Sequence, residues 1–144
     1  MDKRQAVRFC YYISMSKSTT KIGNLGEQIA ADFLEGKGYR VIDTNYRRSY
    51  GEIDIIAYKN NLLFVEVKSV NCRIPEDIPV EGKDTHRPEE NVGKQKCRRL
   101  RRITETYLIH ECTSQPSWRF DLICVYVDAS RERARIKWLE NIII

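Results

Sequence analysis

Two apolar segments, at positions 51–58 and 62–70, constrain the fold of this 144-residue chain more than any other feature. Each has the length of a β-strand, and the short polar interval 59–61 between them is typical of a hairpin. The second segment is apolar on both alternating sides, which indicates a central strand covered on both faces. Four charged residues interrupt the apolar pattern: Glu52, Asp54, Glu66 and Lys68. Because charged groups are costly to bury without a partner, their presence favours a specific role.

The length of the hairpin loop decides whether the two central carboxylates meet. A two-residue turn at Asn60-Asn61 would pair Asp54 with Val67, and Glu66 would then point to the opposite face. A three-residue loop at 59–61 would pair Asp54 with Glu66 instead. Asparagine tolerates the left-handed conformation that such a loop requires. Both alternatives fit the sequence, but only the second, or an equivalent bulge, brings the carboxylates about 5 Å apart.

The periodicity elsewhere predicts one α/β domain over residues 21–144, preceded by an arm, 1–20, that we expect to be flexible and loosely held. Helices are predicted at 21–37 and 93–111, and strands at 39–46, 52–58, 62–70, 119–127 and 134–144. Residues 71–92 contain three prolines and many charges, and are predicted to form a long loop. A helix between the third and fourth strands predicts that these two are parallel. The expected architecture is a mixed five-stranded sheet with helices on both faces.

Composition favours a cytoplasmic domain without a zinc site or a disulfide framework. The five cysteines are scattered, no CxxC or CxxH spacing occurs, and only two histidines are present. No segment has the length or apolar character of a membrane span or signal peptide, so no membrane partner is expected. The net charge of +5 permits a polyanionic partner without requiring one.

If Asp54 and Glu66 meet, their carboxylates repel each other unless a cation lies nearby. Oxygen ligands of this kind suit Mg²⁺ or Mn²⁺. A metal-bound water is a better nucleophile, and Lys68 can orient that water or neutralise developing charge, which predicts phosphodiester hydrolysis. The alternative is a cross-strand ion pair of Lys68 with Glu52 or Asp54 on a solvated face, worth under about 1 kcal/mol.

Both predicted helices leave alternatives open. In the first, Glu27 either forms a capping box with Asn24 or faces the sheet. In the second, six basic residues lie within positions 94–102 with no acidic residue among them. These basic residues form either a solvated helix face or a phosphate-binding surface. The predicted nucleic-acid contacts are Lys94, Gln95, Arg98, Arg101 and Arg102.

Several blocks of the sequence resemble known families. Asp54 followed by Glu66-Val67-Lys68 is similar to the D…ExK signature of restriction-endonuclease-like nucleases. More closely, five blocks in order resemble the YraN-like family of small bacterial proteins: 26–27, 51–57, 64–68, 94–100 and 119–122. Those proteins are similar to Holliday-junction resolvases in fold and motif. The resemblance covers about residues 22–127, most of the chain.

The resemblance implies a restriction-endonuclease-like α/β fold and a set of catalytic residues. It implies that Asp54 and Glu66 bind the metal with help from the Val67 carbonyl, and that Lys68 assists catalysis. It also implies that Glu27 acts as a further catalytic carboxylate, directly or through water. This favours the sheet-facing alternative for Glu27 over the capping box.

Three functions fit these observations. The first is a magnesium-dependent endonuclease that selects branched or junction DNA by shape; two-fold symmetric junctions would favour a homodimer. The second is a nucleic-acid-binding module that has the nuclease fold but little or no turnover. The third is an assembly protein that uses a sheet edge formed by 134–144, whose last three residues are isoleucines. The intact acidic residues favour the first function.

Overall fold

The structure is a computed structural model that describes residues 6–12, 22–71, 93–128, 130, 132–142 and 144. Six strands and two helices follow one another in the described residues: β1 (Ala6–Tyr12), α1 (Ile22–Gly36), β2 (Arg40–Arg48), β3 (Gly51–Tyr58), β4 (Leu62–Asn71), α2 (Lys94–Glu111), β5 (Trp118–Asp128) and β6 (Arg133–Leu139). Neither of the described helices is long and apolar enough to cross a membrane.

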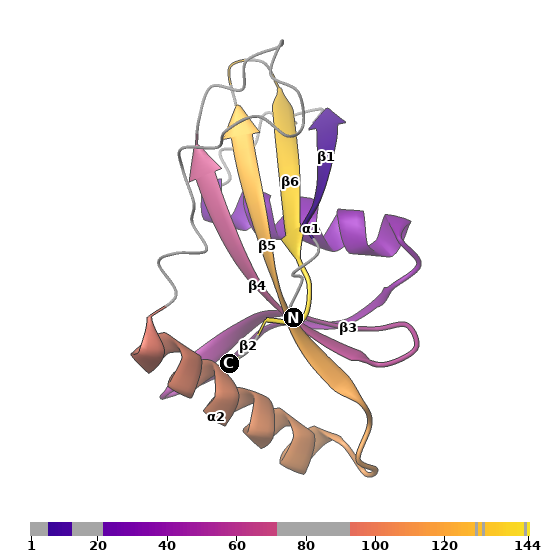
Figure 1. Ribbon diagram of the computed structural model, residues 1–144, viewed down its shortest axis with the longest axis vertical. Helices are drawn as coiled ribbons and strands as arrows, with labels where there is room; N and C mark the ends of the chain where they lie inside the picture. The colour runs from indigo at the N-terminus through magenta and orange to yellow at the C-terminus, as the bar shows by residue number, and fades with distance from the viewer. Residues whose placement is uncertain (1–5, 13–21, 72–92, 129, 131, 143) are drawn as a thin grey trace.

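All six strands form one mixed sheet in the order β1-β6-β5-β4-β3-β2. Only β4 and β5 are parallel, and α2 lies between them in the chain, as predicted. The predicted α/β class and the mixed sheet are therefore confirmed, with the five predicted strands present as β2 to β6. Figure 1 shows β4, β5, β6 and β1 running side by side, whereas the β2–β3 hairpin is turned sharply away from them.

The additional strand, β1, lies within the segment that was expected to be a loosely held arm. It pairs along its whole length with β6, from Ala6 opposite Leu139 to Tyr12 opposite Arg133. This pairing satisfies backbone groups of β6 that would otherwise be exposed at an edge, a gain that no local pattern encodes. The remaining arm residues, 1–5 and 13–20, and residues 72–92 of the predicted loop lie outside the described residues.

The assembly hypothesis required 134–144 to form a free sheet edge, and this expectation is wrong. β6 ends at Leu139 and lies between β1 and β5, so its backbone groups are paired on both sides. Beyond it, the Ile142 N–H donates to the Phe120 carbonyl at 2.7 Å. The described C-terminal residues therefore pack onto the domain itself, which leaves that hypothesis without its proposed surface.

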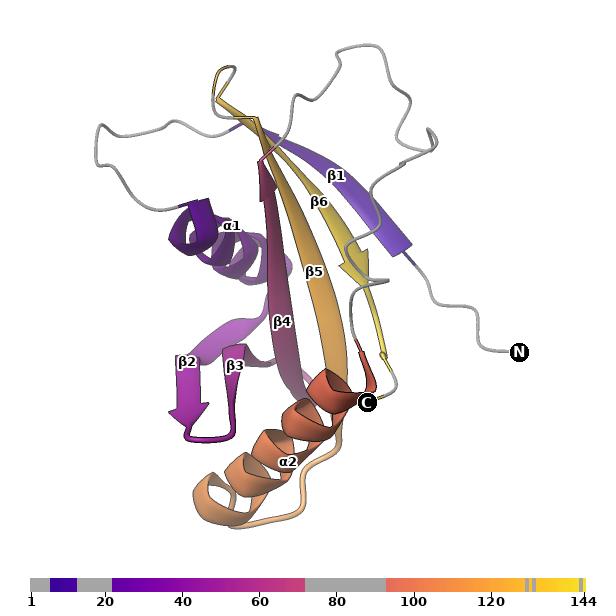
Figure 2. The same ribbon diagram turned by 90° about the vertical axis from the view of Figure 1, so that its left-hand side faces the viewer.

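The two helices cover opposite faces of the sheet, as predicted. α1 contributes Phe33 and its apolar neighbours to a core with Leu63 and Val65 of β4. α2 contributes its apolar stripe, including Ile103, to a second core with Phe64 of the same strand. Alternate side chains of β4 thus enter different cores, which explains why the strand is apolar on both sides. Figure 2 shows the two helices at different heights along β4.

Two glycines position α1. Gly38 lies two residues after the end of α1. Its φ of 91° is a left-handed conformation, which directs the chain into β2. Gly26 lies so close to β4 that a Cβ built on it would be 1.8 Å from the Ser69 Oγ. The missing side chain at Gly26 therefore lets the N-terminal half of α1 approach β4, which places the neighbouring Glu27 beside the sheet.

Candidate active site

The β3–β4 hairpin has the register that brings the carboxylates together. Tyr58 pairs with Leu62, so the loop consists of residues 59–61. The same register places Asp54 opposite Glu66, one position beyond the last paired residues of the two strands. The three-residue loop is therefore confirmed and the two-residue turn is excluded. Asp54 and Glu66 are called the acidic pair below.

Asp54 is 9% exposed and lies where the ladder between β3 and β4 ends. Its Oδ2 accepts a hydrogen bond of 2.7 Å from the Val67 N–H, which fixes the carboxylate against β4. Burial raises the pKa of Asp54 to about 8; the charge of Glu66 acts in the same direction, and the Val67 hydrogen bond opposes both. Burial and the charge of Glu66 thus favour the protonated form of Asp54, despite the lysines around the acidic pair.

Glu66 is 8% exposed and faces two lysines. The Lys96 Nζ, from the first turn of α2, lies 2.5 Å from the Glu66 Oε1, and the Lys68 Nζ lies 3.9 Å from the same oxygen. A hydrogen bond with Lys96, together with burial and the charge of Lys96, lowers the pKa of Lys68. Burial opposes the charged form of Lys96, but its hydrogen bonds and the carboxylate charge of Glu66 outweigh this and raise the pKa of Lys96.

Lys96 was not among the predicted site residues, although a signal was present. It lies one helical turn before the buried Leu100, and so on the stripe of α2 that faces the sheet. Among a run of basic residues this spacing sets it apart from exposed neighbours such as Lys94 and Arg98. Lysine can bury its aliphatic stem along that stripe and still reach a carboxylate with its ammonium group.

Glu27, on α1, is near enough to the acidic pair to interact electrostatically with Asp54 and Glu66. Burial raises its pKa, and the charge of Glu52 adds to this effect. The Asn45 amide, in the orientation that satisfies both neighbours, donates to the Glu52 Oε1 at 2.9 Å and to the Glu27 Oε2 at 3.2 Å. The capping-box alternative is wrong, because α1 begins at Ile22 and Asn24 therefore lies inside the first turn. Neither Asn45 nor Glu52 was assigned to the site from the sequence.

The donor set of the site limits the metal that it can hold. Within the described part of the chain, no three His, Cys, Asp or Glu side chains lie close enough together to bind a metal ion. The acidic pair therefore offers two carboxylates, with the Val67 carbonyl nearby in sequence. This fits Mg²⁺ or Mn²⁺, which prefer oxygen ligands, because Mg²⁺ retains several of its own waters. A divalent cation would also relieve the repulsion that raises the pKa of Asp54.

The predicted nucleic-acid contacts on α2 have different surroundings. Lys94, Gln95 and Arg98 are exposed near the N-terminal end of the helix. Arg101 is also exposed, but its guanidinium donates to the Ile144 carbonyl, through Nε at 3.0 Å and through Nη2. Arg101 therefore holds the C-terminal residue against α2. Arg102 lies over the ring of Tyr50, in the turn between β2 and β3.

One guanidinium–tyrosine stack joins this turn to α2, and a second lies beside it within β2. The Arg102 Cζ lies 3.9 Å from the centroid of the Tyr50 ring, and the Arg48 Cζ lies 4.4 Å from that of Tyr46. Arg48 also donates to the Tyr46 hydroxyl at 2.8 Å, and the Tyr50 and Thr106 hydroxyls share a hydrogen bond. We call Tyr46, Arg48, Tyr50 and Arg102 the arginine–tyrosine surface. Its arginines are exposed and positioned on rigid rings.

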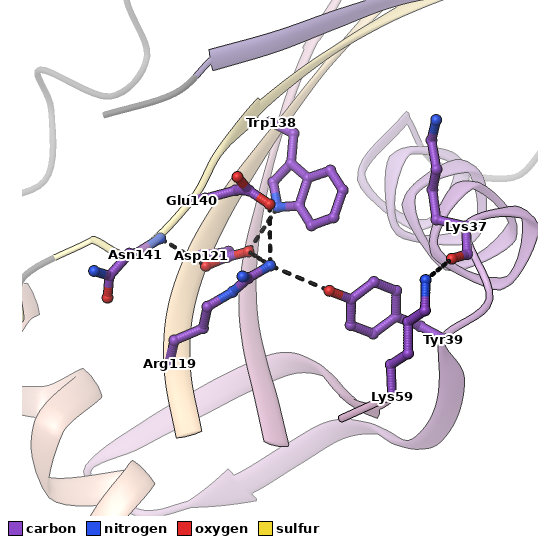
Figure 3. A network of polar contacts seen from close by, with 8 residues as sticks. All are labelled: Lys37, Tyr39, Lys59, Arg119, Asp121, Trp138, Glu140 and Asn141. Carbon is purple, nitrogen blue, oxygen red and sulfur yellow. Dashed lines mark hydrogen bonds and ion pairs between the residues drawn. The ribbon is translucent and has the colours of Figure 1, made fainter. Parts of the chain in front are cut away.

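A second polar network lies around the fully buried Asp121, on the α1 side of the sheet (Figure 3). The Trp138 Nε1 donates to its Oδ2 at 2.7 Å, and the Asn141 N–H donates to its Oδ1 at 2.8 Å. The Arg119 Nη2 lies 3.2 Å from the Oδ2. The same Arg119 nitrogen also donates to the Glu140 Oε1 and the Tyr39 hydroxyl. Because both oxygens of Asp121 are partnered, this network ties β5 to β6 and the chain that follows it.

Comparison with known proteins agrees with the resemblance to the YraN-like family. The model of a family described as "Uncharacterised protein family UPF0102" matches residues 26–125, a segment that includes Glu27, the acidic pair, Lys68 and Lys96. A UPF0102 protein of Alkaliphilus metalliredigens is 40% identical over 128 residues, or 88% of this chain and 98% of the relative. A UPF0102 protein of Chlorobium limicola is 34% identical over 131 residues, or 90% and 94%. The chain therefore belongs to the UPF0102 family.

Proposed function

We propose that this protein is a Mg²⁺- or Mn²⁺-dependent endonuclease that has a restriction-endonuclease-like fold and hydrolyses phosphodiester bonds in DNA. The observation that carries the proposal is the buried acidic pair with Lys68 and Lys96 beside it. Two buried carboxylates repel each other, and burial disfavours their charged forms. Their arrangement at the point where two central strands separate suits a site for a cation and a phosphate better than a structural ion pair.

Each residue of the site has a role in this proposal. Asp54 and Glu66, helped by the Val67 carbonyl, would hold the divalent cation, which supplies an activated water and polarises a phosphoryl oxygen. The Val67 N–H keeps the Asp54 carboxylate in one orientation. Lys68, on the same strand as Glu66, orients the water and neutralises charge that develops on the phosphate. Glu27, held by Asn45 beside the acidic pair, acts through water as the outer carboxylate.

The exposed basic residues provide the DNA-binding part of the proposal. Lys94, Gln95 and Arg98 are exposed on the helix that also brings Lys96 to the acidic pair, so phosphate contacts can lead into the site. The arginine–tyrosine surface extends the positive charge across the β2–β3 turn. Guanidinium and ammonium groups bind phosphates without reading bases. We therefore expect selection of branched or junction DNA by shape, with a homodimer for two-fold symmetric junctions.

Cleavage of labelled four-way junction, flap and linear duplex DNA in Mg²⁺ or Mn²⁺ tests the proposal. The wild type is expected to cut at least one branched substrate. Asp54→Asn and Glu66→Gln should lower the cleavage rate by at least about a thousandfold, and Lys68→Met by about a hundredfold or more. The matched control is Asp32→Asn, which changes an exposed carboxylate of α1 and should leave the rate unchanged. Circular dichroism confirms that each variant is folded.

One observation favours a second candidate, a nucleic-acid-binding module without turnover. Lys96 already supplies a positive charge to Glu66 at 2.5 Å, so the site is partly neutralised without a metal. DNA binding by a wild type that cuts none of the substrates, in either metal, would reject the nuclease and leave this candidate. Absence of DNA binding at low salt would reject both.

A further inference from the structure

The first turn of α2 places a second lysine directly on the acidic pair. The Lys96 Nζ is 2.5 Å from the Glu66 Oε1, whereas Lys68, the lysine of the ExK motif, is at 3.9 Å. The Lys96 side chain is 34% exposed, and that of Glu66 is 11% exposed. Lys96 thus reaches from the surface of the helix to a largely buried carboxylate, and it holds the position closest to Glu66 among the described cations.

The backbone of Lys96 is better fixed than its ammonium group. One turn later, Leu100 is buried in the core between α2 and the sheet, and Ile103 follows in the same core. A Cβ built on Gly51 would lie 3.4 Å from the Arg99 carbonyl, so α2 packs closely against the start of β3. The helix therefore stays in place while the four-carbon side chain of Lys96 can exchange one partner for another by rotating its own bonds.

A divalent cation changes the charge balance of this site. Without a divalent cation, the acidic pair faces two ammonium groups, those of Lys68 and Lys96. Adding two positive charges leaves an excess that repels the nearest ammonium group, which is that of Lys96. A phosphate group arriving at the site restores the balance and offers the displaced ammonium group new oxygen acceptors.

We propose that Lys96 is the internal counter-ion of the acidic pair, that a divalent cation displaces it from Glu66, and that the displaced lysine then contacts a DNA phosphate. This inference rests on the proposed function, since it requires both the cation and DNA at the site. Its consequence is positive coupling. The cation frees Lys96 for DNA, and DNA removes Lys96 as a competitor of the cation. By linkage, each ligand raises the affinity for the other by the same factor.

Calorimetric titration with Ca²⁺, with and without four-way junction DNA, tests this coupling; a gel confirms that the DNA stays intact. Without DNA, Lys96→Met should bind Ca²⁺ about tenfold more tightly than the wild type, because the competing ammonium group is gone. Lys96→Arg keeps a cation on Glu66 and should stay within about threefold of the wild type. The control Arg40→Met removes an exposed charge at the start of β2 and should change nothing. With DNA, the Ca²⁺ affinity of the wild type should rise by a larger factor than that of Lys96→Met.

Two results would overturn the inference while the proposed function stands. One is a folded Lys96→Met variant that binds Ca²⁺ no more tightly than Arg40→Met. The other is an equal effect of DNA on Ca²⁺ affinity in Lys96→Met and the wild type. Conversely, the expected shifts in Ca²⁺ affinity, found in a protein that cuts no DNA, would support the inference and reject the nuclease. Unfolding curves of all four proteins, recorded in parallel, separate these effects from loss of the fold.

Discussion

Replacing Asp54 by asparagine is expected to stabilise the metal-free protein while it removes the cation site. Asp54 is buried, accepts the Val67 N–H at 2.7 Å and faces Glu66. Asparagine keeps a carbonyl oxygen for the Val67 N–H, and its amide can donate to the Glu66 carboxylate. The variant therefore retains the hydrogen bonds of Asp54 and loses only its negative charge.

The magnitude follows from the pKa of Asp54, which burial raises from its ordinary value of 3.8 to about 8. The folded protein thus binds a proton more tightly than the unfolded chain. The resulting stabilisation is fully present below about pH 4, is lost as the pH rises through about 8, and changes by about 1.4 kcal/mol for each pH unit between these values. From pH 5 to pH 8 the free energy of unfolding of the wild type should fall by about 4 kcal/mol relative to Asp54→Asn.

Urea unfolding at pH 5, 6.5 and 8, in the presence of a chelator, measures this difference. The advantage of Asp54→Asn should grow steadily with pH. The control Asp32→Asn, at an exposed position on α1, should show a difference from the wild type that stays within about 0.5 kcal/mol at every pH. Replacing the chelator by Mg²⁺ should stabilise the wild type and not Asp54→Asn, because only the wild type retains the cation site.

A difference that does not change with pH would refute this reasoning. So would a wild type that gains stability relative to Asp54→Asn toward pH 8, since Asp54 would then be better stabilised as a carboxylate in the folded protein than in water. In either case the acidic pair would have sufficient positive charge in Lys68 and Lys96, and the need for an external cation would disappear.

Three further predictions concern the helices and the buried network. Gly26→Ala should destabilise the protein by about 1–3 kcal/mol, because its Cβ would clash with β4, whereas Gly36→Ala, with nothing within 4 Å, should be neutral or slightly stabilising in the same urea titration. Asp121→Ala should cost about 3–5 kcal/mol, because it removes the buried partner of an arginine and a tryptophan; a loss under 1 kcal/mol would contradict this. Charge reversal at Arg98 and Arg102 should weaken junction binding, and should lower the slope of affinity against salt by about 1 for each lost phosphate contact, as measured by fluorescence anisotropy. An unchanged slope would show that these arginines are only a solvated face.

The sequence by itself determined both described helices, the strands β2 to β6 and the charged residues that lie within the β3–β4 hairpin. The two apolar segments 51–58 and 62–70, with a short polar interval between them, identified the hairpin strands and the carboxylates within them, and the helical period identified α1 and α2. The helix between β4 and β5 determined their parallel pairing. These features depend on patterns local to one element or on the order of elements, and both can be read along the chain.

Only the tertiary structure decided which of these residues meet. The sequence allowed two registers for the hairpin, and the structure has the one that opposes Asp54 and Glu66. The pairing of β1 with β6 and the use of Arg101 to hold Ile144 had no distinctive local pattern. The helical spacing of Lys96 indicated the face of α2 on which it lies, but not its contact with Glu66. Each depends on how elements distant in sequence pack against one another. That packing depends on the complementarity of entire helix and sheet faces. The neighbours of a single side chain therefore cannot be predicted from the sequence pattern around it.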